Sequence, residues 1–236
     1  CYGPDGGQMT EVPAAKVSAA IETIDLFEPE HLSFEGALAQ GLVTYIPDSV
    51  WQDYYARIAQ EAIHPENVRK AGLRVVYSPL CGAGGEPVSE ILTRLGAELH
   101  IPESQRRPSG DFATCPTPNP ETDVSFEENY RLAAEVKPDL VLATDPDSDR
   151  IAAAIPTENG FRKFTGNEMG CLLLDYILRG LKERGKLPEK PVAVESIVST
   201  PLAARIAAAH GCEMRIVLTG FKYIGGVILA LEEQGC

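Results

Sequence analysis

The sequence predicts an α/β protein with two similar α/β domains built from β-α-β units. The chain has 236 residues, which exceeds the roughly 100–200 residues of one average domain. From residue 73 onward, short β-branched runs alternate with segments of helical periodicity, a pattern typical of α/β units. The junctions Leu95–Glu98 (LGAE) and His210–Glu213 (HGCE) both close a helix inside such a unit and indicate a weak internal repeat.

Two helices are expected before the first strand. Apolar residues at Val17, Ile21 and Ile24 fall on one face of a helix that begins near Pro13. A second helix begins after Asp48, an acceptable N-cap residue. Its apolar stripe consists of Trp51, Tyr54, Tyr55 and Ile58.

Strands and helices then alternate along the chain. We expect strands at 73–77 and 99–101 around a helix that carries Val88 and Leu92, joined by a right-handed crossover. Residues 102–122 contain five prolines and predict a long irregular loop, which is usually a functional feature. The later elements are a helix over 126–134, strands at 140–144 and 151–155, a helix from 167 with residues 169, 172, 173, 176 and 177 inward, a strand at 192–194, a helix from 201, a strand at 214–218 and a helix over 224–231.

Composition excludes some partners. The formal net charge is −13, whereas nucleic acids and anionic membranes attract a basic surface, so neither is expected to bind. A phosphorylated substrate remains compatible, because a local site can overcome the global charge. No apolar run approaches the roughly 20 residues of a membrane helix. The six cysteines form no C-x-x-C pair, and we expect reduced thiols in a cytoplasmic protein.

The strongest chemical signal is the acidic segment Asp145–Arg150 (DPDSDR), which follows an apolar strand. Ligand sites of open α/β sheets lie at this end of a strand. Asp145, Asp147 and Asp149 are two residues apart, and two ionised carboxylates about 4 Å apart repel by about 4 kcal/mol at an effective dielectric of 20. A cation relieves this repulsion. Hard oxygen ligands with open positions favour Mg²⁺.

Other interpretations of this segment fit less well. An EF-hand loop would need Gly at Arg150 and Glu at Pro156. A haloacid-dehalogenase phosphatase would need Thr or Val at Asp149. A solvated acidic turn is the remaining alternative. Arg150 either balances the aspartate charges or binds phosphate beside the metal, and we favour phosphate binding.

Three turns carry weaker signals. The segment Cys81–Pro87 (CGAGGEP) imitates a dinucleotide fingerprint, but Pro87 occupies the third glycine position, so a plain tight turn is the favoured interpretation. Thr219–Lys222 (TGFK) precedes a helix and either binds phosphate through the helix N-terminus or is an ordinary strand-to-helix turn. Gly166–Glu168 is an adequate helix start without any further role.

Taken together, these residues resemble the alpha-D-phosphohexomutases, the phosphoglucomutase/phosphomannomutase superfamily. The resemblance spans essentially the whole chain. Asp145–Arg150 is similar to the family's metal loop, its most specific motif, and Tyr2–Gln8 is similar to the stretch after its serine loop. Thr165–Glu168 is similar to the entrance of the third domain, and Thr219–Lys222 to the sugar-phosphate loop.

The resemblance implies distinct roles for successive parts of the chain. The implied fold has two similar mixed-sheet α/β domains preceded by a remnant of a third. Residues 1–44 would finish domain 1, 45–163 would form domain 2, and 164–236 would be most of domain 3. Mg²⁺ would be bound by Asp145, Asp147 and Asp149, with a phosphoserine oxygen as a further ligand. The phosphorylated sugar and the sugar bisphosphate would contact Asp149, Arg150, Thr219, Gly220 and Lys222.

The resemblance also implies a limit on activity. The sequence has no serine in a Thr-Ala-Ser-His-Asn-Pro setting and no Gly-Glu-Glu-Ser sugar loop, so no catalytic nucleophile is assigned. We expect an inactive fragment of an enzyme that interconverts sugar 1- and 6-phosphates. Glucose, mannose and pentose phosphates are not distinguished. The alternatives are a metal-dependent phosphatase with an aspartate nucleophile and a non-catalytic α/β module that binds phosphate or a nucleotide.

Overall fold

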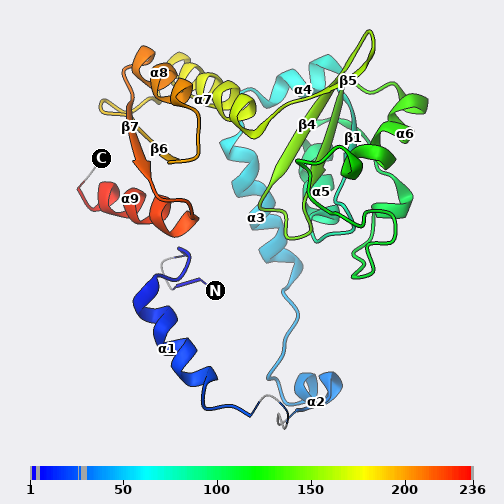
Figure 1. The fold of residues 1–236 in the computed structure, drawn as a ribbon, viewed down its shortest axis with the longest axis vertical. Helices are drawn as coiled ribbons and strands as arrows, with labels where there is room; N and C mark the ends of the chain where they lie inside the picture. The colour runs from blue at the N-terminus through cyan, green and yellow to red at the C-terminus, as the bar shows by residue number, and fades with distance from the viewer. Residues whose placement is uncertain (1, 4–5, 26, 28–30, 235–236) are drawn as a thin grey trace. The chain divides into compact units, whose positions relative to one another are not determined.

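A computed structural model describes residues 2–3, 6–25, 27 and 31–234. It divides into a terminal unit, residues 1–48 and 187–236, and a central unit, residues 49–186. Figure 1 follows the chain through both units. Among the described residues, no helix combines the length and the apolar character needed to cross a membrane.

The central unit contains a mixed sheet in the order β2-β1-β3-β4-β5. β1 pairs in parallel with β2 and β3, whereas β4 is antiparallel to both β3 and β5. The strands are β1 (Arg74–Ser78), β2 (Glu98–His100), β3 (Leu140–Thr144), β4 (Ile151–Thr157) and β5 (Gly160–Lys163). The helices of this unit are α3 (Asp48–Glu61), α4 (Pro65–Ala71), α5 (Gly85–Leu95), α6 (Glu127–Val136) and α7 (Gly166–Glu183), with short 3₁₀ turns η1 (Glu103–Gln105) and η2 (Val124–Phe126).

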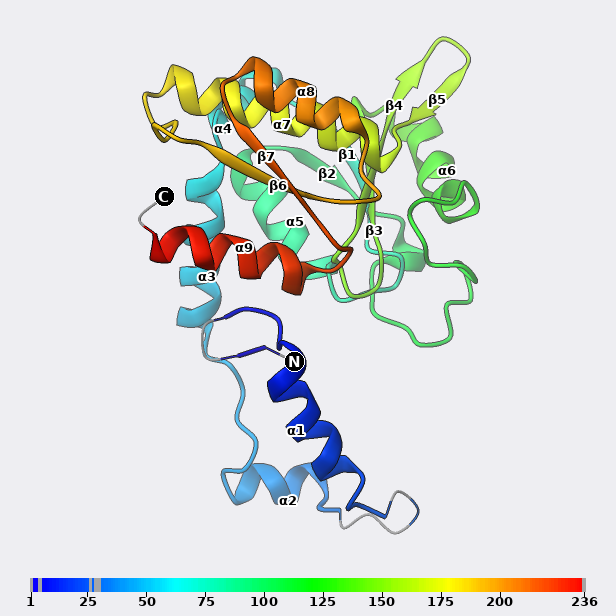
Figure 2. The same ribbon diagram turned by 60° about the vertical axis from the view of Figure 1, so that its left-hand side comes forward.

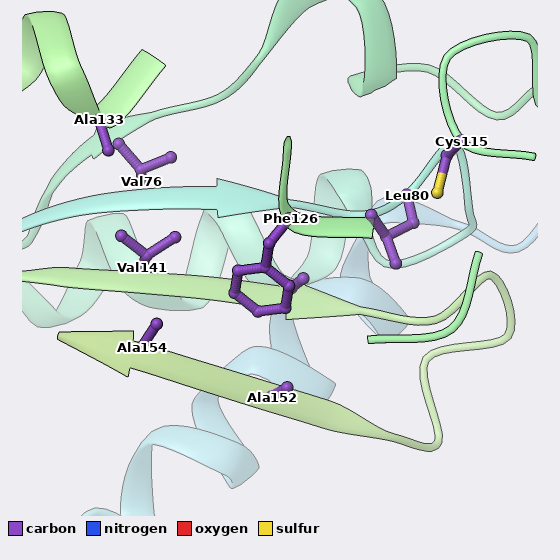
Figure 3. Close-up of a cluster of buried hydrophobic side chains, with 9 residues drawn as sticks. Val76, Leu80, Cys115, Phe126, Ala133, Val141, Ala152 and Ala154 are labelled. Carbon is purple, nitrogen blue, oxygen red and sulfur yellow. The ribbon is translucent and has the colours of Figure 1, made fainter. Parts of the chain in front are cut away.

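Both faces of the central sheet are covered. On one face, Val76 of β1, Val141 of β3 and Ala154 of β4 lie next to one another on adjacent strands, beside Phe126 and Ala133 (Figure 3). The opposite face is packed by residues of α5 and by neighbouring loops, including Val88, Leu92 and Ile101. Burying a Val or Phe side chain stabilises the fold by roughly 1.5–3 kcal/mol. This α/β/α arrangement confirms the predicted fold class.

The terminal unit holds a parallel pair of strands, β6 (Val192–Ser196) and β7 (Glu213–Val217). Helix α8 (Pro201–Ala209) packs against β7, and α9 (Phe221–Glu233) packs against β6. The strand pair and both helices are seen in Figure 2. This unit also includes α1 (Glu11–Ile21) and α2 (Phe34–Ala39), neither of which has a buried residue among those described.

The two junctions that indicated a repeat share their geometry. Gly96 and Gly211 both adopt a left-handed φ, at 94° and 72°, a conformation that only glycine adopts without strain. Each is followed two residues later by the start of a strand, β2 at Glu98 and β7 at Glu213.

The predicted long loop between β2 and α6 is held by buried polar groups. Gln105 is 1% exposed and accepts a hydrogen bond from Ser78 Oγ at 2.7 Å. Its amide Nε2 donates to the Thr114 carbonyl at 3.0 Å. Each buried polar group needs such a partner, so the end of β1 fixes the path of the loop.

One expectation about α7 is wrong for most of the residues it names. The residues predicted to point inward include Leu172, Leu173 and Ile177, yet these side chains are 55%, 48% and 43% exposed. Within the predicted stripe, Met169 packs against the core, and Gly180, seven residues after Leu173 on the same face, lets the backbone approach Ile63 closely. Cys171 and Leu178, on the other side of the helix, are also buried.

Four cysteines in the described part of the chain, Cys81, Cys115, Cys171 and Cys212, are buried free thiols. Burial is also the largest cause of the raised pKa of the Cys115 and Cys212 thiols. Thiols of this kind are unreactive. Cys1 and Cys236 lie outside the described residues, as do Pro4 and Asp5 of the Tyr2–Gln8 segment.

Candidate metal and phosphate site

The aspartate loop, Asp145–Arg150, connects the antiparallel strands β3 and β4, whose end residues Thr144 and Ile151 are paired. The Ser148 backbone N–H donates to the Asp145 carbonyl at 3.1 Å, and Ser148 has a left-handed φ of 63°. This tight turn brings the alternate residues of the loop onto one side. One carboxylate oxygen from each of Asp145, Asp147 and Asp149 lies within 4.8 Å of those of the other two.

Asp145 is the buried member of the cluster, with an exposed fraction of 1%. Its Oδ1 accepts the Arg150 backbone N–H at 3.0 Å, and its Oδ2 accepts Arg150 Nε at 2.7 Å. Burial alone raises the pKa of this carboxyl, but the two hydrogen bonds and the positive charge of Arg150 outweigh burial and lower it. Asp145 is therefore held ionised.

Asp147 and Asp149 are exposed to solvent. The pKa of Asp149 is raised, by partial desolvation first and then by the negative charges of Asp147 and Asp145. The donor set therefore suits a hard divalent cation, because a cation would offset this repulsion. Carboxylate oxygens also keep lone pairs after accepting one hydrogen bond, so Asp145 can pair with Arg150 and still ligate a metal.

Arg150 is half exposed and lies beside the three carboxylates. Besides Asp145, it faces Asp149 Oδ1 at 3.8 Å from Nε, and its Nη1 donates to Asn119 Oδ1 at 3.3 Å. Hydrogen bonding to Asp145 is the main reason why the pKa of Arg150 is raised. A guanidinium fixed in this way, next to a cation site, is suited to binding a phosphate oxygen.

Asn119 was not among the predicted site residues, although it lies in the loop expected to be functional at 102–122. Asn119 lies 31 residues before Arg150, so no local spacing connects them. Two buried hydroxyls near the aspartate loop were also not predicted. They belong to Tyr77 and Thr144 and are hydrogen-bonded to each other at 2.9 Å. A tyrosine and a threonine inside apolar strands give no sequence signal for this contact.

The other predicted ligand residues, Thr219, Gly220 and Lys222, belong to the terminal unit. Thr219 is exposed, and Gly220 has a φ of 134° immediately before α9. Lys222 Nζ lies 3.5 Å from Glu11 Oε1 and 4.9 Å from the centre of the Tyr223 ring. The structure thus brings together Asp145, Asp147, Asp149 and Arg150 in one unit and places Thr219–Lys222 in the other.

Comparisons of this chain with family models and with known proteins all point to the same family. Residues 52–160 match the family model described as phosphoglucomutase/phosphomannomutase, alpha/beta/alpha domain II, and residues 165–233 match domain III of the same family. The chain is 31% identical over 237 residues to a phosphoglucomutase of Staphylococcus epidermidis, and 30% identical over 234 residues to a phosphomannomutase of Mycoplasmoides pirum.

Each of these alignments covers 99% of this chain and 42% of the relative, so the chain spans less than half the length of these proteins. The fold is also similar to the crystal structure of a phosphoglucomutase/phosphomannomutase family protein from Burkholderia thailandensis. That comparison has a TM-score of 0.55 and 17% identity, and covers 76% of this chain and 36% of that one. The chain belongs to the phosphoglucomutase/phosphomannomutase family, the alpha-D-phosphohexomutases.

Proposed function

We propose that this chain forms the metal site and part of the sugar-phosphate site of a Mg²⁺-dependent phosphohexomutase that interconverts sugar 1- and 6-phosphates. The observation that carries the proposal is the convergence of three carboxylates within 4.8 Å, next to Arg150. Oxygen-only ligands with open positions favour Mg²⁺ over softer metals. The family membership supports this choice of reaction class.

The chain's own residues have separate roles in this proposal. Asp145, Asp147 and Asp149 would hold Mg²⁺, which supplies positive charge next to the phosphoryl group. Arg150 would bind a phosphate oxygen, while Asp145 and Asn119 fix its orientation. Thr219, Gly220 and Lys222 would contribute to binding the sugar phosphate. Phosphoryl transfer depends mainly on such positioning and charge neutralisation.

The phosphoryl donor in this proposal is a phosphoserine, and residues 1–236 contain no Thr-Ala-Ser-His-Asn-Pro sequence. We therefore propose that these residues bind a phosphorylated sugar and a sugar bisphosphate without transferring the phosphoryl group. The two alternatives that the sequence leaves open differ from this in a measurable way. A phosphatase would release phosphate from a generic phosphoester, and a nucleotide-binding module would bind ATP in preference to a sugar bisphosphate.

The test is calorimetric titration of the chain with glucose 1,6-bisphosphate, with and without Mg²⁺, and with ATP as a competing ligand. Binding that requires Mg²⁺ and is weakened in Arg150→Gln is expected. The matched control is Arg131→Gln, which changes an exposed arginine on α6 in the same unit. Hydrolysis of p-nitrophenyl phosphate would contradict the proposal. So would a bisphosphate affinity that is unchanged both without Mg²⁺ and in Arg150→Gln.

A further inference from the structure

The glycine loop, Cys81–Gly84, lies directly against the aspartate loop. It follows β1, and the aspartate loop follows β3, and these two strands are parallel neighbours with Ser78 opposite Ala143. Both loops therefore leave the sheet at the same edge. The Ala83 backbone N–H donates to the Pro146 carbonyl at 2.8 Å, so the two loops share a backbone hydrogen bond.

Gly82 leaves no space for a side chain on the side of the aspartate loop. A Cβ at this position would lie 2.3 Å from Pro146 Cα and 2.5 Å from the Pro146 carbonyl oxygen. Both are backbone atoms, which cannot rotate away as the end of a side chain can. Any residue with a Cβ at position 82 therefore has to displace the aspartate loop or the glycine loop.

Gly84 faces three hydroxyl groups that surround the same loop. A Cβ there would lie 2.4 Å from Ser148 Oγ, 2.8 Å from the Tyr77 hydroxyl oxygen and 3.1 Å from Thr144 Oγ1. Ser148 belongs to the aspartate loop, and Thr144 is the residue just before it. The hydrogen-bonded hydroxyls of Tyr77 and Thr144 are buried, so they have little freedom to move.

Neither glycine is required by its own backbone conformation. Gly84 has a φ of −69°, and Gly82 also lies outside the left-handed region. The left-handed residues of this turn are instead Leu80 and Cys81, with φ of 48° and 61°, which is unfavourable for residues that have a Cβ. Glycine at 82 and 84 is thus explained by close approach to the aspartate loop and not by the shape of the turn.

We propose that the glycine loop is a positioning element for the metal site, and that Gly82 and Gly84 set the conformation in which the three carboxylates converge. This inference rests on the proposed metal-binding function. Residues outside the ligand set that orient ligands commonly control metal affinity. The glycine loop would do so through backbone contact and steric fit.

The experiment compares Gly82→Ala with two matched substitutions in the same unit. Gly85→Ala introduces a comparable clash, 2.8 Å from the Arg106 carbonyl oxygen, but no aspartate-loop atom is among the near contacts of its Cβ. Gly110→Ala meets nothing within 4 Å. For each variant, the Mn²⁺ dissociation constant is measured by electron paramagnetic resonance, and thermal unfolding is measured without metal.

Gly82→Ala is expected to weaken Mn²⁺ binding by about 10- to 100-fold. Gly85→Ala should lower the unfolding temperature but change Mn²⁺ affinity by no more than about twofold, and Gly110→Ala should change neither beyond that range. Equal Mn²⁺ affinity in Gly82→Ala and the unaltered chain would overturn the positioning role of the glycine loop but leave the proposed metal-binding function intact. An unaltered chain that binds no Mn²⁺ would overturn the proposed function as well.

If Gly82→Ala does not fold, Gly84→Ala decides the question, because the closest atom it meets is a side-chain oxygen. Its Mn²⁺ affinity should fall, and adding Ser148→Gly should restore part of it. That second change removes the Oγ atom 2.4 Å away, and glycine accepts the left-handed φ of residue 148. Unchanged Mn²⁺ affinity in a folded Gly84→Ala would overturn the inference.

Discussion

Arg150 holds Asp145 at two points, through its backbone N–H to Oδ1 at 3.0 Å and through Nε to Oδ2 at 2.7 Å. Asp145 is buried, whereas Arg150 is half exposed. The pair closes the aspartate loop, because residues 145 and 150 are its first and last. One carboxylate of the cluster therefore has a structural role in addition to the proposed metal-binding role.

Asp145→Asn should reduce the free energy of unfolding by about 1.5–3 kcal/mol, the range for hydrogen bonds to charged groups. Because the pKa of Asp145 is lowered in the folded state, its contribution is present above the ordinary Asp pKa and is lost as pH falls through the folded value. Urea unfolding at neutral and acidic pH measures this. The exposed Asp111→Asn is the control. A stability difference that persists unchanged at acidic pH would contradict the account.

Asn119→Ala should weaken glucose 1-phosphate binding by about 2- to 10-fold. The lost hydrogen bond from the Arg150 guanidinium is long, at 3.3 Å, and exposed to solvent, so we expect it to contribute about 0.5–1.5 kcal/mol, below the usual range for charged groups. The variant loses the acceptor for Arg150 Nη1 but leaves all three carboxylates in place, so Mn²⁺ affinity should not change. Calorimetry with each ligand separates the two effects. Asn67→Ala, on the exposed side of α4, is the matched control. A parallel loss of Mn²⁺ affinity would show that Asn119 acts on the metal site instead.

Two alanine substitutions in α7 should have opposite effects on the free energy of unfolding. Gly170→Ala meets nothing within 4 Å and should stabilise the protein by about 1 kcal/mol, the difference in helix propensity. Gly180→Ala would place its Cβ 2.4 Å from Ile63 Cγ2 and should destabilise it by about 1–3 kcal/mol. Thermal or urea unfolding measures both. Stabilisation by both substitutions would mean that α7 does not pack on Ile63.

Tyr77 should make stability fall at high pH. Burial raises its pKa from 10.0 to about 12. The neutral form therefore contributes stability that is complete below pH 10 and is lost as pH rises through about 12, up to about 3 kcal/mol. Urea unfolding at about pH 8 and pH 11 should show a smaller decline for Tyr77→Phe than for the unaltered chain. Equal declines in the free energy of unfolding of the two proteins would mean that the Tyr77 hydroxyl is not protected from ionisation by burial.

Much of the fold could be predicted from the sequence because its elements are long or continuously apolar. The bounds of β3 agree with the prediction at 140–144, since that run is apolar and ends at the acidic segment. Helices α2 and α4 were missed because six and seven residues hold too few turns to show a helical period. The four-residue β5 was missed for the same reason.

The burial of α7 was predicted wrongly for most of its stripe, for a different reason. The helix has apolar residues at Leu172, Leu173 and Ile177, and periodicity alone assigns this whole stripe to the interior. In the structure these side chains are largely exposed, and the close contact of this face is made by Gly180 with Ile63. Close backbone approach is decided by the partner element, which the sequence of the helix does not contain.

The part of the site that could be predicted from the sequence consists of residues that are close together along the chain. Three aspartates with alternate spacing and a following arginine indicate a cation site without any tertiary information, and the structure brings them together. The division of the chain at residues 44 and 163 stays a prediction, as do the ligand roles of Thr219, Gly220 and Lys222. Asn119 and Gly82 could not be found, because their contacts with Arg150 and Pro146 exist only after the strands have paired.

The central claim is that the aspartate loop binds a divalent cation, and titration of the chain with Mn²⁺, followed by competition with Mg²⁺, tests it most directly. The chain should bind Mn²⁺ at one site, and Mg²⁺ should displace it. Asp147→Asn should weaken binding without changing stability, since Asp147 is exposed and the substitution removes one charge at nearly constant volume. Asp111→Asn should bind as the unaltered chain does. Identical Mn²⁺ curves for Asp147→Asn, Asp111→Asn and the unaltered chain would contradict the claim and leave the loop as a solvated acidic turn.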